Sequence, residues 1–259
     1  MKPENVQSFS LVKLFVVIGA LALLAIVLIP AISKAKLEAG LHTAGYRGKN
    51  IFTAIVGASL REPGISYTAW PKAQIDGNAG HDDTEAQDAS GKTFSNSTRY
   101  FYELYDGANI GTKCWEPIVS PEEFDFSKLA GAGVPEMVGT GALRPENNMW
   151  CVAGNLHGDM DEIVPVLVTR NVDCSSFRIK TQGSPDTRLQ WSQQYKTPFG
   201  KKGFALIRKG GAIFYGTAKN ATTGAVYPME EGVYVRSADG NANFASLVYL
   251  TPDGIAYPQ

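Results

Sequence analysis

The chain has 259 residues, a formal net charge of -1 at pH 7 and an isoelectric point near 6.3. Such a balance provides no basic surface, so nucleic acid is not an expected partner. The 27 glycines, 14 prolines and 11 tyrosines are typical of a loop-rich domain with β-structure and argue against a helical bundle.

The strongest pattern is an apolar run near the N-terminus, at residues 14–29, which carries no charge and is followed by Pro30. Beyond it, apolar residues recur at steps of three and four, as on one face of a helix. These residues are Leu37, Leu41, Ala44, Ile51, Phe52, Ile55, Val56 and Leu60. Since Pro63-Gly64 ends the pattern, one helix is predicted over residues 9–62, about 80 Å long at 1.5 Å per residue.

The two halves of this helix differ in character. The first half is long enough for a membrane, which about 20 apolar residues span. The second half has an apolar stripe suited to a globular partner. A cleavable secretory signal normally ends at a small-residue site after its apolar stretch, whereas this stretch continues into an amphipathic helix.

The segment "FSLVKLFVVIGALALLAIVLIPAISKAK" resembles the N-terminus of type IV pilins and of type II secretion pseudopilins. In that family a short polar leader precedes a phenylalanine, and an apolar helix follows with a proline 21 residues later. Phe9 and Pro30 have this separation. The stretches "PAISKAKLEA", "TFSNSTRYFYELY", "NNMWCV", "VPVLVTRN" and "TPFGKKGFALIRKGG" resemble prepilin-like proteins of Verrucomicrobia and Lentisphaerae.

The resemblance implies a leader at residues 1–8, cleaved by the prepilin peptidase between Ser8 and Phe9. Ser8 stands where the family usually has glycine, and Lys13 stands where it nearly always has glutamate. That glutamate is thought to neutralise the N-terminal ammonium of a neighbouring subunit. Lys13 therefore has two interpretations: it reaches the headgroups from the helix start, or it pairs with an acid on a different subunit.

The resemblance also implies an α+β, pilin-like fold, with a transmembrane or filament-core half at residues 9–33 and an amphipathic half at residues 34–62. A globular periplasmic or extracellular domain follows at residues 63–259. Small residues in the apolar run would let neighbouring helices approach closely, and Pro30 would mark a place where the helix can bend. The small residues are Gly19, Ala20, Ala22 and Ala25.

The remaining chain begins with a polar stretch at residues 65–92, predicted as a surface loop. A second helix follows, which Ser95 or Asn96 can cap, with an aromatic packing face and Gly107 at its end. Strands are predicted at 148–154, 162–169, 203–209, 211–217 and 244–251. The turn signal at Lys209-Gly210-Gly211 predicts a hairpin over 203–217.

Short connections without alternating helices predict an antiparallel sheet. One face is expected to pack on the second half of the long helix. The other face is expected to meet water or a neighbour.

The three cysteines are Cys114, Cys151 and Cys174, and their spacing fits no zinc pattern. If the domain lies outside the cytoplasm, one disulfide is expected, and the nearness of Cys151 and Cys174 to predicted strands favours that pair. Three buried reduced thiols are the alternative.

Catalytic motifs are missing from the sequence, so no enzyme is predicted. The three histidines, His42, His81 and His157, are far apart and no HExxH motif occurs. No cofactor is expected except calcium. Major pseudopilins can hold calcium in C-terminal loops, and the resemblance makes Asp239, Asn241 and Asp253 the candidate ligands.

The implied function is a structural subunit of a type IV pilus-like filament or of a type II secretion pseudopilus. Its partners would be its own copies, other pilins or pseudopilins, inner-membrane lipid, the prepilin peptidase and the assembly machinery. It would cross the inner membrane once, with its C-terminal domain in the periplasm, and then enter a periplasmic or cell-surface filament. The choice between the two systems, and between a major and a minor subunit, stays open. A single-pass membrane-anchored periplasmic binding protein that does not polymerise is the alternative.

Overall fold

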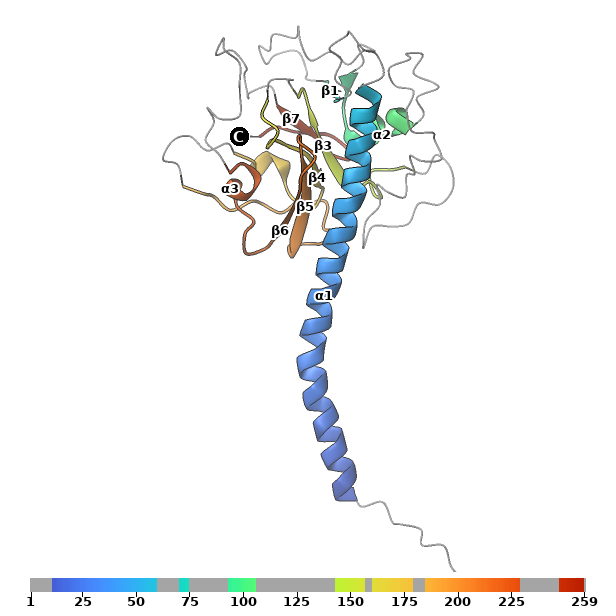
Figure 1. The fold of residues 1–259 in the computed structure, drawn as a ribbon, viewed down its shortest axis with the longest axis vertical. Coiled ribbons are helices and arrows are strands. Elements are labelled where there is room, and N and C mark those ends of the chain that lie inside the picture. The colour runs from blue at the N-terminus through green and yellow to red at the C-terminus, as the bar shows by residue number, and fades with distance from the viewer. Residues whose placement is uncertain are drawn as a thin grey trace, which may run out of the picture. The chain divides into compact units, whose positions relative to one another are not determined.

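The computed structural model describes residues 11–59, 70–74, 93–105, 143–156, 160–178, 185–228 and 247–258. The chain divides into two compact units, Met1–Ala39 and Gly40–Gln259. Helix α1 (Leu11–Ser59) contributes to both units (Figure 1). The single long helix predicted over residues 9–62 is confirmed over these 49 residues.

The second unit is built on an antiparallel sheet. Among the described residues the sheet has six strands in the order β6-β5-β4-β3-β7-β8. The strands are β3 (Trp150–Gly154), β4 (Pro165–Thr169), β5 (Gly203–Arg208), β6 (Ile213–Thr217), β7 (Val248–Leu250) and β8 (Ile255–Ala256).

The predicted hairpin over 203–217 is confirmed. Strands β5 and β6 pair from Gly203↔Thr217 to Ile207↔Ile213. The connection uses Gly211 in the left-handed region, at φ +78°, where glycine is favoured because it lacks a Cβ atom. Its amide donates to the carbonyl of Arg208 at 2.7 Å, which closes the turn.

One face of the sheet packs on the part of α1 that belongs to the second unit. A Cβ atom on Gly48 would lie 2.9 Å from Cγ1 of Ile207, and one on Gly203 would lie 3.2 Å from Cδ1 of Leu41. Glycines on both elements therefore allow the backbones of helix and strand to approach. The predicted contact between the amphipathic half of the helix and the sheet is confirmed.

The expectation that the other face meets water or a neighbour is wrong. That face is covered by residues 172–178 and 185–191 and by the short helix α3 (Thr223–Val226), which place Phe177, Leu189 and Val226 against it. Strands β3 and β4 are consequently buried at every residue. Strands buried on both faces have continuous apolar sequences, as "WCVAG" and "PVLVT" do, and this signal could have been recognised.

The second predicted helix is α2 (Ser97–Tyr105). Asn96 caps it, because its side-chain oxygen accepts a hydrogen bond from the amide of Arg99 at 2.8 Å. Tyr100, Phe101 and Leu104 are buried, as the predicted packing face requires. The predicted end at Gly107 lies outside the described residues.

Two short strands, β1 (Lys72–Ala73) and β2 (Thr93–Phe94), were not predicted. They pair in parallel, so the stretch predicted as loop over 65–92 contains a strand at its start. Two-residue strands carry too little periodicity to be recognised in a sequence.

A buried arginine joins two irregular segments beside the sheet, one before β3 and one before β5. The guanidinium of Arg170, only 3% exposed, donates to the carbonyl oxygens of Pro145 at 2.5 Å, Asn148 at 2.9 Å and Thr197 at 3.3 Å. It also lies 4.7 Å from the ring centroid of Tyr195. Since the guanidinium has a planar fork of donors, it satisfies several carbonyls at once, which makes its burial tolerable.

Candidate functional site

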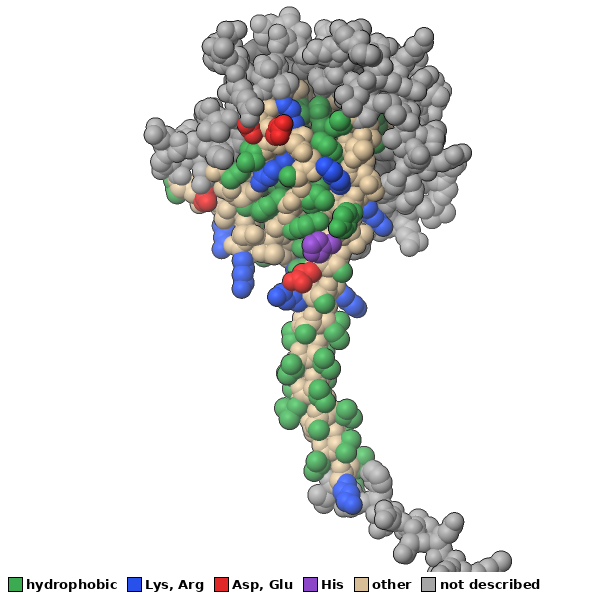
Figure 2. Space-filling view, in the orientation of Figure 1, with side chains coloured by type: hydrophobic (Ala, Val, Ile, Leu, Met, Phe, Trp, Pro, Cys, Tyr) green, Lys and Arg blue, Asp and Glu red, His purple; other side chains and the backbone are tan. Residues whose placement is uncertain are grey.

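The candidate site is the apolar part of α1 within the first unit. Its large hydrophobic side chains are exposed, and in Figure 2 apolar side chains project from this part of the helix along its length. They include Leu11, Phe15, Leu23, Ile26, Val27 and Ile29, each more than 60% exposed. Within the described part of the chain, α1 is the one helix long and apolar enough to cross a membrane.

Two lysines define the length of this apolar segment. Lys13 and Lys34 are both exposed, and residues 14–33 between them carry no charge. These 20 residues span about 30 Å of helix, which equals the thickness of the hydrocarbon core of a bilayer. Lys34 also lies 3.7 Å from Glu38, one helical turn further on. Among the residues that the structure describes, no carboxylate pairs with Lys13.

Pro30 lies inside α1 without ending it. Proline has no amide hydrogen, so the helix lacks one backbone hydrogen bond at this point. The hydroxyl of Ser33 donates to the carbonyl oxygen of Ile29 at 2.9 Å. The predicted bend site is thus a position where the helix continues, and a serine side chain adds a local hydrogen bond beside it.

The small residues of the apolar run are arranged along the helix. Gly19, Ala22 and Ala25 follow one another at steps of three and form a strip that turns by about 60° around the axis at each step, whereas Ala20 lies about 100° from Gly19 in the opposite direction. A Cβ atom on Gly19 would have no neighbour within 4 Å. All four positions are exposed in the single chain, so the predicted packing role of this strip stays a prediction.

The second-unit part of α1 is fastened to the sheet by polar as well as apolar contacts. The ammonium group of Lys49 donates to the carbonyl oxygen of Gly211 at 2.7 Å and lies 4.8 Å from the ring centroid of Phe52. The imidazole of His42 packs edge-on against Tyr215 of β6, with centroids 4.6 Å apart. This histidine therefore has a packing role at the helix–sheet contact.

The other candidates implied by the resemblance are only partly within the described residues. Ser8 and Phe9 lie outside them, as do Asp239 and Asn241. Asp253 lies in the β7–β8 connection, where it accepts hydrogen bonds from Thr251 at 3.3 Å and from the side chain of Gln194. No group of three or more metal-ligating side chains occurs in the described ranges, and the calcium site stays a prediction.

The structure brings together the two cysteines that the sequence analysis pairs. Cys151 and Cys174 are both buried, with free thiols that lie close enough to interact with each other. Burial is the largest cause that raises the pKa of the Cys174 thiol well above its ordinary value, and the contact with Cys151 adds to it. The Cys174 group is therefore a neutral thiol near pH 7.

A polar cavity was not predicted from the sequence. It has a volume of about 220 Å³ and is lined by Ser175, Ser176, Arg178, Thr187, Arg188 and Gln190. The guanidinium of Arg188 donates to the carbonyl oxygen of Ala218 at 2.8 Å. The lining comes from two short irregular segments with no recognisable motif, so no sequence signal indicated it.

Comparisons with protein-family models, with curated proteins and with solved structures give no match for this chain. What the fold itself defines is an α+β protein with one long apolar N-terminal helix and a C-terminal antiparallel sheet. The length and composition of the helix are compatible with a single-pass membrane anchor.

Proposed function

We propose that the chain is a subunit of a type IV pilus-like filament or of a type II secretion pseudopilus. The observation that carries this proposal is the single helix Leu11–Ser59, whose first part exposes apolar side chains while its second part packs on an antiparallel sheet. A helix of this design can be held in a membrane and later exchange lipid for the helices of neighbouring subunits. The prepilin-like sequence from Phe9 to Lys36 supports the same function.

Association of such helices would depend on packing. Lipid tails are as apolar as leucine, so inside a bilayer there is no hydrophobic force that drives helices together. Close approach of the backbones then provides the favourable contact, and the open strip of Gly19, Ala22 and Ala25 permits it. The globular domain would lie on the filament surface and contact its neighbours or a bound partner.

The spacing of the two lysines supports the membrane stage of this cycle. With about 30 Å of uncharged helix between them, Lys13 and Lys34 can both place their ammonium groups at the headgroups of opposite leaflets. Lys13 would then mark the cytoplasmic boundary of the inner membrane, with the sheet domain in the periplasm.

Mass spectrometry of the mature N-terminus tests the proposal. The full chain is expressed in a host with a prepilin peptidase, and a chain beginning at N-methylated Phe9 is the expected product. A Ser8→Gly variant serves as the matched control, because it restores the residue usual in the family and should be processed at least as completely. An intact Met1 in both chains, or cleavage after Ala31 by ordinary signal peptidase, would contradict the proposal.

The second candidate function, a membrane-anchored periplasmic binding protein, is favoured by the polar cavity. Its two arginines, Arg178 and Arg188, are suited to a carboxylate or phosphate group. This function needs the anchor but no polymerisation. Three results together would support the binding protein over the filament subunit. The chain would keep its Met1, it would stay monomeric in detergent, and its affinity for inorganic phosphate would fall in the Arg178→Ala variant.

A further inference from the structure

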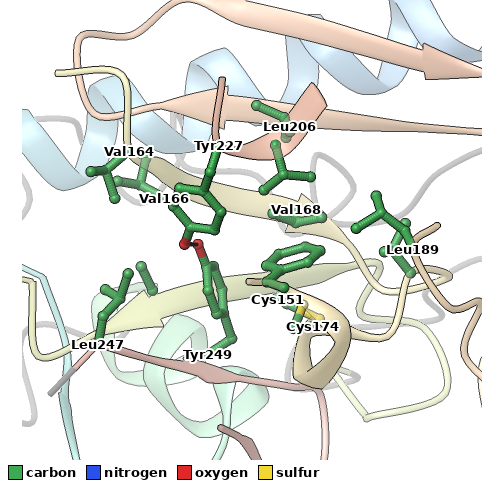
Figure 3. Packing of buried hydrophobic residues seen from close by; sticks show 14 of the residues in the cluster. Cys151, Val164, Val166, Val168, Cys174, Leu189, Leu206, Tyr227, Leu247 and Tyr249 are labelled. Atoms are coloured by element: carbon green, nitrogen blue, oxygen red, sulfur yellow. Dashed lines mark hydrogen bonds between the residues drawn. The ribbon is translucent and has the colours of Figure 1, made fainter. Parts of the chain in front are cut away.

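Two buried thiols in the second unit lie next to each other, and the proposed function gives them no role. Cys151 lies in β3, and Cys174 is the first residue of the 3-10 helix η3 (Cys174–Ser176). Each is 1% exposed, and both belong to the apolar cluster between the sheet and the segment that covers it. Figure 3 shows the two sulfur atoms next to each other within this cluster.

Both cysteines are held in place by their backbones. Cys151 pairs with Val168 in the register of β3 and β4. Next to Cys174, Asp173 caps η3. The carboxylate of Asp173 accepts hydrogen bonds from the amide of Ser175 at 3.0 Å and from the hydroxyl of Ser175 at 2.6 Å. The amide of Asp173 in turn donates to the carbonyl oxygen of Gln190 at 2.9 Å. The two thiols therefore lie side by side because the backbones of β3 and η3, which carry them, are each held in place.

Other roles for this pair fit less well. A metal site needs more ligands than two thiols, and the described residues hold no such cluster. A nucleophile must reach a thiolate form and an accessible position, whereas these thiols are buried and the pKa of Cys174 is raised. Two buried, contacting sulfurs in a domain outside the cytoplasm are suited to a cross-link.

We propose that Cys151 and Cys174 form a structural disulfide that is made while the domain folds. Only the oxidising compartment in this proposal rests on the proposed function; the pairing rests on the contact between the two thiols. The oxidant is a protein or small-molecule disulfide. One cysteine thiolate attacks it and forms a mixed disulfide, and the second thiolate then displaces the remaining half of the oxidant as a thiol. The two cysteines lose two electrons and two protons, and the oxidant disulfide becomes two thiols.

Burial fixes the order of events. Once the cluster has closed, an external disulfide cannot reach either sulfur, so oxidation must precede the docking of η3 on β3. The cross-link would close a loop between residues 151 and 174 and so restrict the unfolded chain. A loop of this length is expected to raise the melting temperature by about 6–12 °C relative to the reduced protein. It would also fix the segment that carries Ser175 and Ser176 at the polar cavity.

Counting free thiols tests the proposal on the full chain. The protein is exported, purified in detergent without reductant, unfolded in the presence of N-ethylmaleimide and weighed. One label is expected, on Cys114, together with a non-reduced peptide that links Cys151 to Cys174. The Cys114→Ala variant should take no label and keep the linked peptide. Three labels on the exported chain, or a linkage that includes Cys114, would overturn the proposal.

A second experiment separates this proposal from the filament proposal. The full chain is unfolded and reduced, then refolded in detergent with a mixture of oxidised and reduced glutathione, which supplies the oxidant whatever the compartment. Formation of the Cys151–Cys174 peptide supports the pairing even if the mature N-terminus is not processed. Its absence from correctly refolded protein overturns the pairing and leaves the filament proposal unaffected.

Discussion

Gly48 of α1 lies so close to the indole of Trp150 in β3 that a Cβ atom on Gly48 would be 2.6 Å from Cη2 of the ring. Trp150 is fully buried, so the ring has little room to move away. The helix and the central strand of the sheet are therefore joined at a position where only a hydrogen atom fits.

We expect Gly48→Ala to destabilise the globular unit. Alanine favours a helix over glycine by about 1 kcal/mol, but overpacking against a rigid buried ring costs about 1–3 kcal/mol. The net effect should be a lower melting temperature, measured by circular dichroism. Gly19→Ala is the matched control in the same helix, because nothing lies within 4 Å of its added Cβ atom, and it should not lower the melting temperature. Equal behaviour of the two variants would contradict the close contact.

Replacing Arg170 should cost more than replacing an exposed arginine. Arg170→Met removes the donors that satisfy one buried and two part-buried carbonyl oxygens, and Arg170→Lys cannot serve them all, so both variants should lose about 2–4 kcal/mol of unfolding free energy. Chemical denaturation measures the loss. Arg144→Met, at an exposed side chain, should change stability by less than about 0.5 kcal/mol. If Arg170→Met left the free energy of unfolding unchanged, the hydrogen-bond network of Arg170 would contribute no net stability.

Stability should fall at alkaline pH. Burial, assisted by the contact with Tyr227, raises the pKa of Tyr249 well above its ordinary 10.0, and burial raises that of Cys174 above its ordinary 9.0. Because the folded state holds these protons more tightly, stability is unaffected below the unfolded pKa and declines as pH rises beyond it, by up to about 1.4 kcal/mol per pH unit for each group. Unfolding curves of the reduced protein should decline from near pH 9. The oxidised protein should decline only from near pH 10, since Cys174 can no longer titrate. Coincident profiles would contradict the thiol contribution.

Bulky residues in the small-residue strip should impair assembly without unfolding the domain. Gly19→Leu and Ala22→Leu keep the apolar character of the helix but hold neighbouring backbones apart. We expect less filament by electron microscopy of sheared cell material and unchanged thermal unfolding of the purified chain. Val27→Leu adds a side chain of similar size elsewhere in the apolar run and should assemble normally. Normal filaments from both strip variants would count against the packing role.

Lys13→Glu distinguishes the two interpretations of this lysine. If Lys13 pairs with an acid on another subunit, reversing its charge should reduce incorporation into filaments, as measured by immunoblotting of the sheared fraction. If it only reaches the headgroups, incorporation should not change. Lys36→Glu, outside the apolar span, controls for net charge. Unchanged incorporation of Lys13→Glu would leave no specific role for Lys13.

The parts of the fold that could be predicted have either a long apolar pattern or clear turn residues between two apolar stretches. Helix α1 follows from its apolar run and stripe, and the β5–β6 hairpin follows from Lys209-Gly210-Gly211 between two apolar stretches. Strand β8 and the β1–β2 pair were missed because each has only two residues. The second layer of the core was missed because the sequences of residues 172–178 and 185–191 have no apolar period to recognise.

The same distinction applies to the candidate site. Lys13, Pro30 and the small residues were found because they lie in one continuous segment. The meeting of Cys151 with Cys174 could be proposed only from their nearness to strands, since contacts between distant segments depend on topology. The polar cavity and the Arg170 network were not found at all, because each is assembled from residues separated by loops of irregular sequence.

The pairing of β3 with β7 has a consequence for biosynthesis. Val152 lies in register opposite Leu250, a partner 98 residues later in the chain. Strand β3 therefore waits for one of its two neighbours until the ribosome has passed residue 250, long after α1 has been translated. During that interval the edge of β3 that later pairs with β7 presents unpaired backbone groups, so the unfinished chain is expected to aggregate more readily than the complete one.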